Sequence, residues 1–130
     1  MFIMAIEPIQ NMNASEVRAY FADKHTQKDL ADAFAMTSNK FWWVEDNVYD
    51  YEAGSPEQQA ALAVTDEWGA LMDEYESRIC GILTAEGVVI PKIGKIKVLE
   101  PFMKKHGYIN GRGWWIKEQK DYTPMDSGPL

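Results

Sequence analysis

Two pairs of carboxylates have the spacing that could hold a divalent cation. Asp73 and Glu76 lie three residues apart in a stretch with helical periodicity, and Asp29 and Asp32 repeat that spacing nearer the start. Residues three apart share one helix face, and carboxylate oxygens are the ligands that Mg²⁺ prefers. Two such pairs on facing helices could hold a catalytic magnesium ion, although the same spacing is common on solvated helix faces.

This pairing is similar to that of the all-helical nucleotide pyrophosphohydrolases, which implies Mg²⁺-dependent hydrolysis as one alternative. Other chemistry is sparse. Cys80 is interpreted as a small hydrophobic residue, and His25 and His106 stand at expected helix ends, where an imidazolium acts as a cap. No histidine–cysteine spacing suits zinc, and the "GRG" at 111–113 lacks the context of a phosphate-binding loop. We therefore predict no enzyme, no metal site and no cofactor.

Residues 26–46, "TQKDLADAFAMTSNKFWWVED", have the pattern of two short packed helices. The positions expected to be buried or to frame the pair are Gln27, Leu30, Ala31, Phe34, Met36, Phe41 and Val44. The segment resembles the helix-turn-helix of phage-repressor-type regulators, with Ala35 where that family usually has a glycine turn. The resemblance covers about a sixth of the chain.

The helix-turn-helix resemblance implies DNA contacts at the start of its second helix. The residues at those positions are Thr37, Ser38, Asn39 and Lys40. Their polar side chains suit phosphates and base edges. Trp42, Trp43, Glu45 and Asp46 depart from the pattern, because bulk and negative charge oppose entry into a DNA groove.

A basic block follows near the end of the chain, where residues 91–130 carry a net charge of +4. Within it, "HGYINGRGWWIKEQK" predicts a hairpin, because Asn-Gly is a strong turn signal. We expect Tyr108 and Ile109 to pair with Trp115 and Trp114 across an Asn110–Gly113 loop. Strand alternation then places one tryptophan in the core and exposes the other.

The first functional hypothesis combines these features. It is a small non-catalytic accessory protein that binds nucleic acid through the helix-turn-helix-like pair, the basic hairpin or both. The predicted contact residues are Ser38, Asn39, Lys40, Lys104, Lys105, Arg112, Trp115 and Lys117. Basic side chains beside an exposed aromatic ring suit phosphates and bases. The alternative for each of them is a structural role, with tryptophans in the core and lysines in solvent.

The middle of the chain supports a different hypothesis, since residues 41–90 carry a net charge of −10. The residues expected on the exposed face of the long helix are Asp66, Glu67, Asp73 and Glu74. Such a face could imitate DNA phosphates and occupy the basic groove of a protein partner. Anti-restriction and anti-CRISPR proteins of mobile elements act as inhibitors in this way. The alternative is that this acidic face is only solvated and keeps the protein soluble.

The elements that position these residues can be predicted from caps and periodicity. Asn13 with Glu16, Thr26, and Ser55 with Pro56 and Gln58 are expected to begin helices. A third helix is predicted from about Ser38 to Tyr51, and a long one from 55 to 87, ended by Gly87. Residues 88–98 are expected to be extended. A short helix with Leu99, Phe102 and Met103 inward then ends at Gly107.

The predicted fold is α+β and predominantly helical, in a single domain over 1–130. It has a helical cluster (13–52), one long central helix (55–87), a basic helix-plus-hairpin block (88–120) and a flexible tail (121–130). A homodimer through the long helix is one possibility. We expect a cytoplasmic location without a membrane partner, because the lone Cys80 allows no disulfide and no apolar run reaches about 20 residues. The start "MFIMAIEPIQ" lacks the basic region of a signal peptide.

Overall fold

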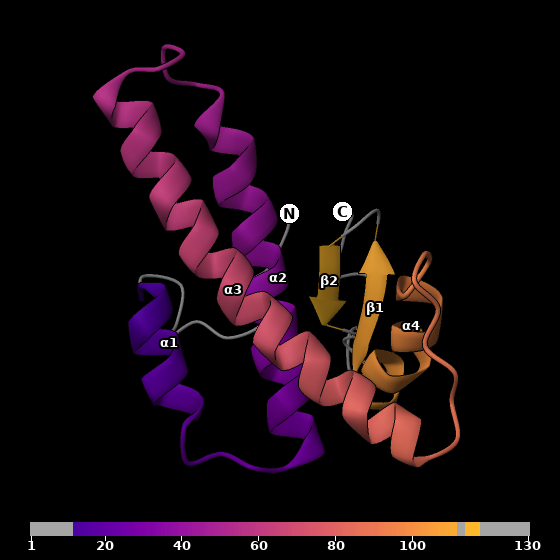
Figure 1. Ribbon diagram of the computed structural model, residues 1–130. Helices are drawn as coiled ribbons and strands as arrows, with labels where there is room; N and C mark the ends of the chain where they lie inside the picture. Colours follow the sequence, from indigo (N-terminus) through magenta and orange to yellow (C-terminus); the bar gives the residue numbers. More distant parts are fainter. Residues whose placement is uncertain (1–11, 112–113, 118–130) are drawn as a thin grey trace, which may run out of the picture.

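The computed structural model describes residues 12–111 and 114–117 (Figure 1). In chain order, its elements are α1 (Ala14–Phe21), α2 (Gln27–Val48), α3 (Pro56–Ala85), α4 (Ile96–Lys105), β1 (Tyr108–Gly111) and β2 (Trp114–Lys117). The two strands form one antiparallel sheet. The predicted fold is thus confirmed: it is mainly helical, with one long central helix and a small hairpin after a short helix.

Helices α2 and α3 run side by side and organise the rest of the molecule (Figure 1). Helix α1 packs on one side of this pair, and α4 with the hairpin lies on the other. The core therefore has two halves that meet at α2 and α3. Phe21 of α1 meets Tyr75 of α3 with their ring centroids 6.1 Å apart, and Phe34 of α2 meets Trp115 of β2 at 6.0 Å.

Residues 26–48 do not form the predicted helix-turn-helix. They form the single helix α2, so the predicted boundary near Ser38 is wrong. Neither glycine nor proline interrupts residues 34–40, so nothing there breaks the helix. Thr37 fits the interior because its hydroxyl donates to the carbonyl oxygens of Ala33 (2.8 Å) and Phe34 (3.2 Å). A continuous helix removes the turn that would have presented a second helix to DNA.

The predicted helix ends agree with the structure in most respects. Asn13 and Glu16 form a capping box at α1, and Thr26 accepts a hydrogen bond from the Asp29 amide at α2. Gly87, with φ of +91°, ends α3: its N–H donates to Thr84 and the next N–H donates to Leu83. One detail differs, because the Gln58 side chain accepts from the Gly54 amide rather than closing a box with Ser55.

A close contact between α2 and α3 depends on a glycine. A Cβ atom added to Gly69 would lie 3.0 Å from Cε1 of Phe41 on the facing helix. At Gly81, in contrast, the added atom would meet nothing within 4 Å. The two helices therefore approach closely at Gly69, and Gly81 has no such contact.

The chain after α3 differs from the predicted extended segment. Residues 88–95 form neither helix nor strand, and α4 already begins at Ile96. Gly94 has φ of +82°, which suits glycine and turns the chain into the helix. The inward positions Leu99, Phe102 and Met103 are buried as predicted, and α4 ends before Gly107 with φ of +95°.

The hairpin forms, but its register differs from the prediction. Tyr108 pairs with Lys117, Ile109 with Ile116, Asn110 with Trp115 and Gly111 with Trp114. The pairing is shifted by two residues because Asn110 and Gly111 belong to β1 and not to the loop. A shift of two does not change which side chains share a face, so Trp114 and Trp115 still point to opposite faces of the hairpin.

Candidate binding surfaces

The residues predicted to read DNA from the second helix lie in the core. Ser38 is 4% exposed and Asn39 is fully buried. The Asn39 amide forms two hydrogen bonds with the backbone of Trp115: its Nδ2 donates to the carbonyl oxygen (2.8 Å), and its Oδ1 accepts from the N–H (2.9 Å). Asn39 thus attaches β2 to α2 and satisfies strand groups that would otherwise be unpaired. The predicted DNA contacts of Ser38 and Asn39 are wrong, since neither side chain can reach a ligand of that size.

One tryptophan of the hairpin lies in the core as predicted, but it is Trp115, the one that was assigned to the binding site. Trp115 is 2% exposed and packs in the core, so it cannot stack on a base. Trp114 is half-buried. Arg112 lies outside the described residues. Lys104, Lys105 and Lys117 are exposed, and these three remain available for phosphates.

Lys40, the last residue predicted at the start of the second helix, is half-buried. Its Nζ lies 5.0 Å from the ring centroid of Trp43 and 5.8 Å from that of Trp68. Burial lowers the pKa of the Lys40 ammonium. The cation is therefore directed along the α2–α3 contact and over aromatic rings.

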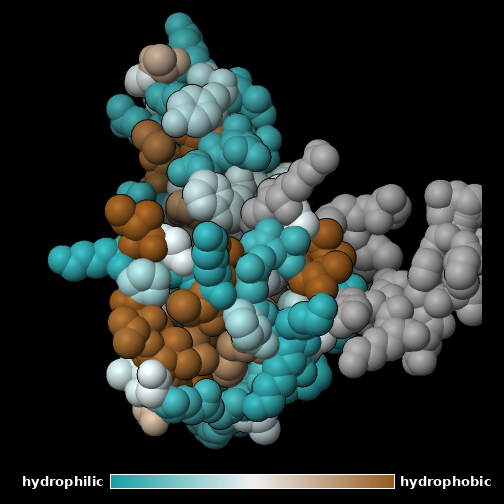
Figure 2. Space-filling model, turned by 90° about the vertical axis from the view of Figure 1, so that its right-hand side faces the viewer, coloured by the Kyte–Doolittle hydropathy of each residue, from teal (hydrophilic) through white to brown (hydrophobic). Residues whose placement is uncertain are grey.

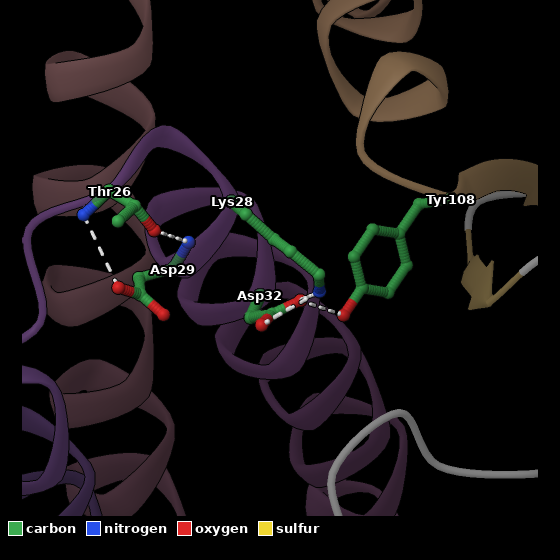
Figure 3. A network of polar contacts seen from close by, with 5 residues as sticks. All are labelled: Thr26, Lys28, Asp29, Asp32 and Tyr108. Carbon is green, nitrogen blue, oxygen red and sulfur yellow. Dashed lines mark hydrogen bonds and ion pairs between the residues drawn. The ribbon is translucent and has the colours of Figure 1, made fainter.

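A network of polar contacts at the start of α2 explains two of the paired carboxylates (Figure 3). Asp29 accepts a hydrogen bond from the Thr26 amide at 3.2 Å, and hydrogen bonding to Thr26 lowers its pKa. Asp32 accepts from the Tyr108 hydroxyl at 2.6 Å and lies 3.3 Å from Lys28 Nζ. Both acids have structural partners. Among the described residues, no group of three or more His, Cys, Asp or Glu side chains could hold a metal ion.

The histidine and the cysteine are not arranged for chemistry either. His106 stands at the C-cap of α4 as expected. However, burial lowers the pKa of its imidazole, and the positive charges of Lys105 and Lys28 lower it further. It is therefore not the cationic cap that the sequence suggested. Cys80 is half-buried, and burial, followed by Glu76, raises the pKa of its thiol, which disfavours the reactive thiolate.

The acidic residues predicted on α3 are exposed, with one of them paired. Glu74 accepts a hydrogen bond from Arg18 Nη2 at 2.7 Å. Asp66, Glu67 and Asp73 make no ion pair within residues 12–111 and 114–117. Residues seven apart lie two helical turns or about 10.5 Å apart. Asp66 with Asp73, and Glu67 with Glu74, therefore form two rows on the outer face of α3.

The ends of α2 and α3 that meet at the connecting loop extend beyond the other elements (Figure 1). We call residues 41–68 the arm. Its large exposed apolar side chains, with exposed fractions of 43–80%, are Trp42, Trp43, Tyr49, Tyr51, Leu62 and Val64. Val64 is among them, because no third element of the described structure covers the α2–α3 pair there. The arm also carries seven carboxylates and no lysine or arginine.

A groove of about 610 Å³ lies where the arm meets the hairpin and α4. The residues that line it are Phe34, Ser38, Trp42, Asp46, Met72, Glu76, Ile96, Leu99, Asn110, Trp114 and Trp115. They come from α2, α3, α4 and both strands, so sequence spacing alone does not reveal the groove. One sequence pattern does relate to the groove. Phe34, Ser38, Trp42 and Asp46 recur every four residues, so they lie on one side of a helix, and this side lines the groove.

Hydrophobic side chains gather in a patch on the face that carries α4 and the hairpin (Figure 2). Val89 and Ile93, in the segment before α4, are 84% and 90% exposed. Ile96 is 38% exposed and also lines the groove, so it connects this apolar surface with the groove.

Within residues 12–111 and 114–117, no helix is both long enough and apolar enough to cross a lipid bilayer. The chain matches no family model, no curated protein and no solved structure.

Proposed function

We propose that this chain is a non-catalytic protein-binding module whose arm docks on a basic surface of a partner. The observation that carries the proposal is the composition of the arm. Six large apolar side chains are exposed on it, among carboxylates and without any cation. Contiguous exposed apolar surface marks interaction sites, and aromatic residues are enriched at interface centres.

The charge of the arm indicates the kind of partner. From residue 41 to residue 77 the chain carries ten acidic residues and no basic one. Of these, only Glu74 and Glu76 form ion pairs with other described residues. Such a field attracts a cationic surface and speeds association with it. Surfaces that bind nucleic acid carry clustered lysine and arginine side chains that neutralise phosphates, so an inhibitor that occupies such a surface fits the arm.

The test is binding to a fluorescent nonaarginine peptide, with two triple variants of equal net charge. The arm variant combines Asp50→Asn, Glu52→Gln and Glu57→Gln, all at exposed positions. The control combines Asp23→Asn, Glu86→Gln and Glu100→Gln, which are exposed but lie outside the arm. We expect the arm variant to bind about tenfold more weakly and the control to change by less than about twofold. Equal weakening of both would show that total charge alone attracts the peptide, against the proposal.

A second candidate is a phosphate-binding surface at the opposite end of α2. Burial is the main cause that lowers the pKa of His106, and the nearby charges of Lys105 and Lys28 lower it further. Lys117 Nζ lies 5.8 Å from the ring centroid of Tyr108. Three elements thus bring lysines to one place. If this surface binds duplex DNA, affinity should fall by roughly 0.9 log units per log of salt for each phosphate contacted. Charge reversal at Lys105 and Lys117 should abolish that binding, and a wild type without DNA binding at low salt would rule the surface out.

A further inference from the structure

The groove beside the arm has the form of a binding site. Phe34, Ser38 and Trp115 are buried and form its floor, while Trp42, with 43% of its surface exposed, stands at its mouth. Its volume of about 610 Å³ lies within the range of roughly 300–1,000 Å³ that is typical of ligand sites. Apolar and aromatic side chains supply most of the lining, which favours an occupant with apolar groups.

Among the described residues that line the groove, the charged ones are both carboxylates, Asp46 and Glu76. Asp46 makes no ion pair within the described part of the chain. Glu76 Oε1 lies 3.6 Å from Lys95 Nζ, which is longer than a close hydrogen-bonded pair. The described lining therefore carries a net negative charge above an apolar floor. Its electrostatic complement is a cation attached to an apolar group.

The length of the groove indicates a peptide segment. Phe34, Ser38, Trp42 and Asp46 follow one another by single helical turns, so the row spans about 18 Å. About five residues of extended chain have that length. Arginine suits the mouth better than lysine, because its planar guanidinium can stack on the Trp42 indole while it donates to the Asp46 carboxylate.

We infer that the groove binds a short extended segment of the partner, with an arginine at Trp42 and Asp46 and apolar side chains on the floor. The inference rests on the proposed function, because it takes the segment from the same basic partner. It adds a specific anchor to a surface that is otherwise recognised by charge and exposed aromatic groups. Hot spots of this type combine an aromatic or arginine anchor with a pocket.

The test uses an acetylated, amidated pentapeptide with the sequence alanine-leucine-arginine-leucine-alanine, titrated into the full chain by calorimetry. Analogues carry lysine, glutamine or glutamate at the centre. We expect the arginine peptide to bind best, the lysine peptide about threefold more weakly, the glutamine peptide about tenfold more weakly, and the glutamate peptide not at all. Equal binding of the arginine and glutamate peptides would overturn the inference.

Two matched pairs of variants locate the site. Trp42→Ala should weaken the arginine peptide at least about tenfold, whereas Trp43→Ala should not, because the more exposed Trp43 does not line the groove. Asp46→Asn should weaken it about three- to tenfold, with Asp23→Asn, exposed and outside the arm, as the neutral control. The inference fails if the two tryptophan variants behave alike. It also fails if the peptide binds only after residues 1–10 are removed, since the chain itself would then fill the groove.

The outcome is separable from that of the proposed function. The arm variant keeps every residue that lines the groove. If it loses nonaarginine binding and Trp42→Ala loses the pentapeptide, both proposals are supported. If the pentapeptide is bound but the arm variant and its equal-charge control bind nonaarginine alike, only the acidic-arm function is refuted. If the arm behaves as expected but the pentapeptide does not bind, only the groove is refuted.

Discussion

Replacement of Asn39 by alanine should destabilise the protein strongly, although the side chain has no role at the surface. The variant removes two hydrogen bonds of 2.8 and 2.9 Å and leaves the buried N–H and carbonyl oxygen of Trp115 without those partners. Each unsatisfied buried group costs about 1–3 kcal/mol. With partial relief by water, the expected loss in the free energy of unfolding is about 2–4 kcal/mol.

Thermal unfolding converts this loss into a measurable shift. An unfolding entropy of about 2.1 cal/mol/K per residue gives a shift of about 4 °C per kcal/mol for a chain of 130 residues. The melting temperature of Asn39→Ala should therefore fall by about 8–15 °C. The matched control is Asn47→Ala on the same helix, because the Asn47 amide donates only to the Trp43 carbonyl oxygen at an exposed position. Its cost should stay below about 1 kcal/mol.

Asn39→Asp provides a pH-dependent check of the same contact. The carboxylate could still accept from the Trp115 N–H but could not donate to the carbonyl oxygen, and burial would raise its pKa. A raised pKa in the folded state means that the protonated variant is the more stable form. Relative to wild type, the variant should thus be least stable above about pH 6 and should recover towards pH 4. A melting temperature of Asn39→Ala within about 3 °C of the Asn47→Ala control would refute the structural role of Asn39.

Two further predictions test the packing and the polar network. Gly69→Ala should lower the free energy of unfolding by about 1–2 kcal/mol, because the added Cβ would lie 3.0 Å from Phe41. Gly81→Ala, with free space around the added atom, should raise it by about 0.5–1 kcal/mol. Chemical denaturation measures both variants, and equal changes would contradict the role of Gly69. Tyr108→Phe should cost about 1.5–3 kcal/mol at pH 7, because it removes a 2.6 Å hydrogen bond to the Asp32 carboxylate. Burial is the main cause that raises the pKa of Tyr108, and the hydrogen bond to Asp32 raises it further. The wild type should therefore lose stability as pH rises above about 10. Melting curves at alkaline pH should show a smaller loss of stability with pH in Tyr108→Phe than in the wild type.

Local signals predicted the helices and their ends because those depend on neighbouring residues. Asn13, Thr26 and Ser55 cap helices through contacts within three residues, and Gly87 ends α3 because it accepts a positive φ. The mistaken turn in α2 came from the resemblance of residues 26–46 to a helix-turn-helix, which placed the polar residues 37–40 at the start of a second helix. Thr37 bonds within its own helix, and Asn39 bonds to a strand 76 residues away.

The candidate site could be predicted only in part, for the same reason. The acidic character of the middle block was visible in the sequence, since it is a sum over neighbouring residues. The exposure of Trp42 and Trp43 depends on the absence of a third element over the arm in the described structure, and the groove requires residues from five elements. Neither feature has a local pattern. Trp115 was assigned to the wrong face because its burial depends on Phe34 and Asn39.

The most direct test of the central claim is a map of amide chemical shifts in the isotope-labelled full chain, titrated separately with nonaarginine and with a short DNA duplex. Our account predicts that nonaarginine perturbs residues 41–68 and the groove residues on α2. If the arm is the binding surface and the second candidate is wrong, the duplex leaves residues 104–117 unperturbed. The contradicting result is a response to DNA at Lys104, Lys105 and Lys117 together with an arm that does not respond to the peptide.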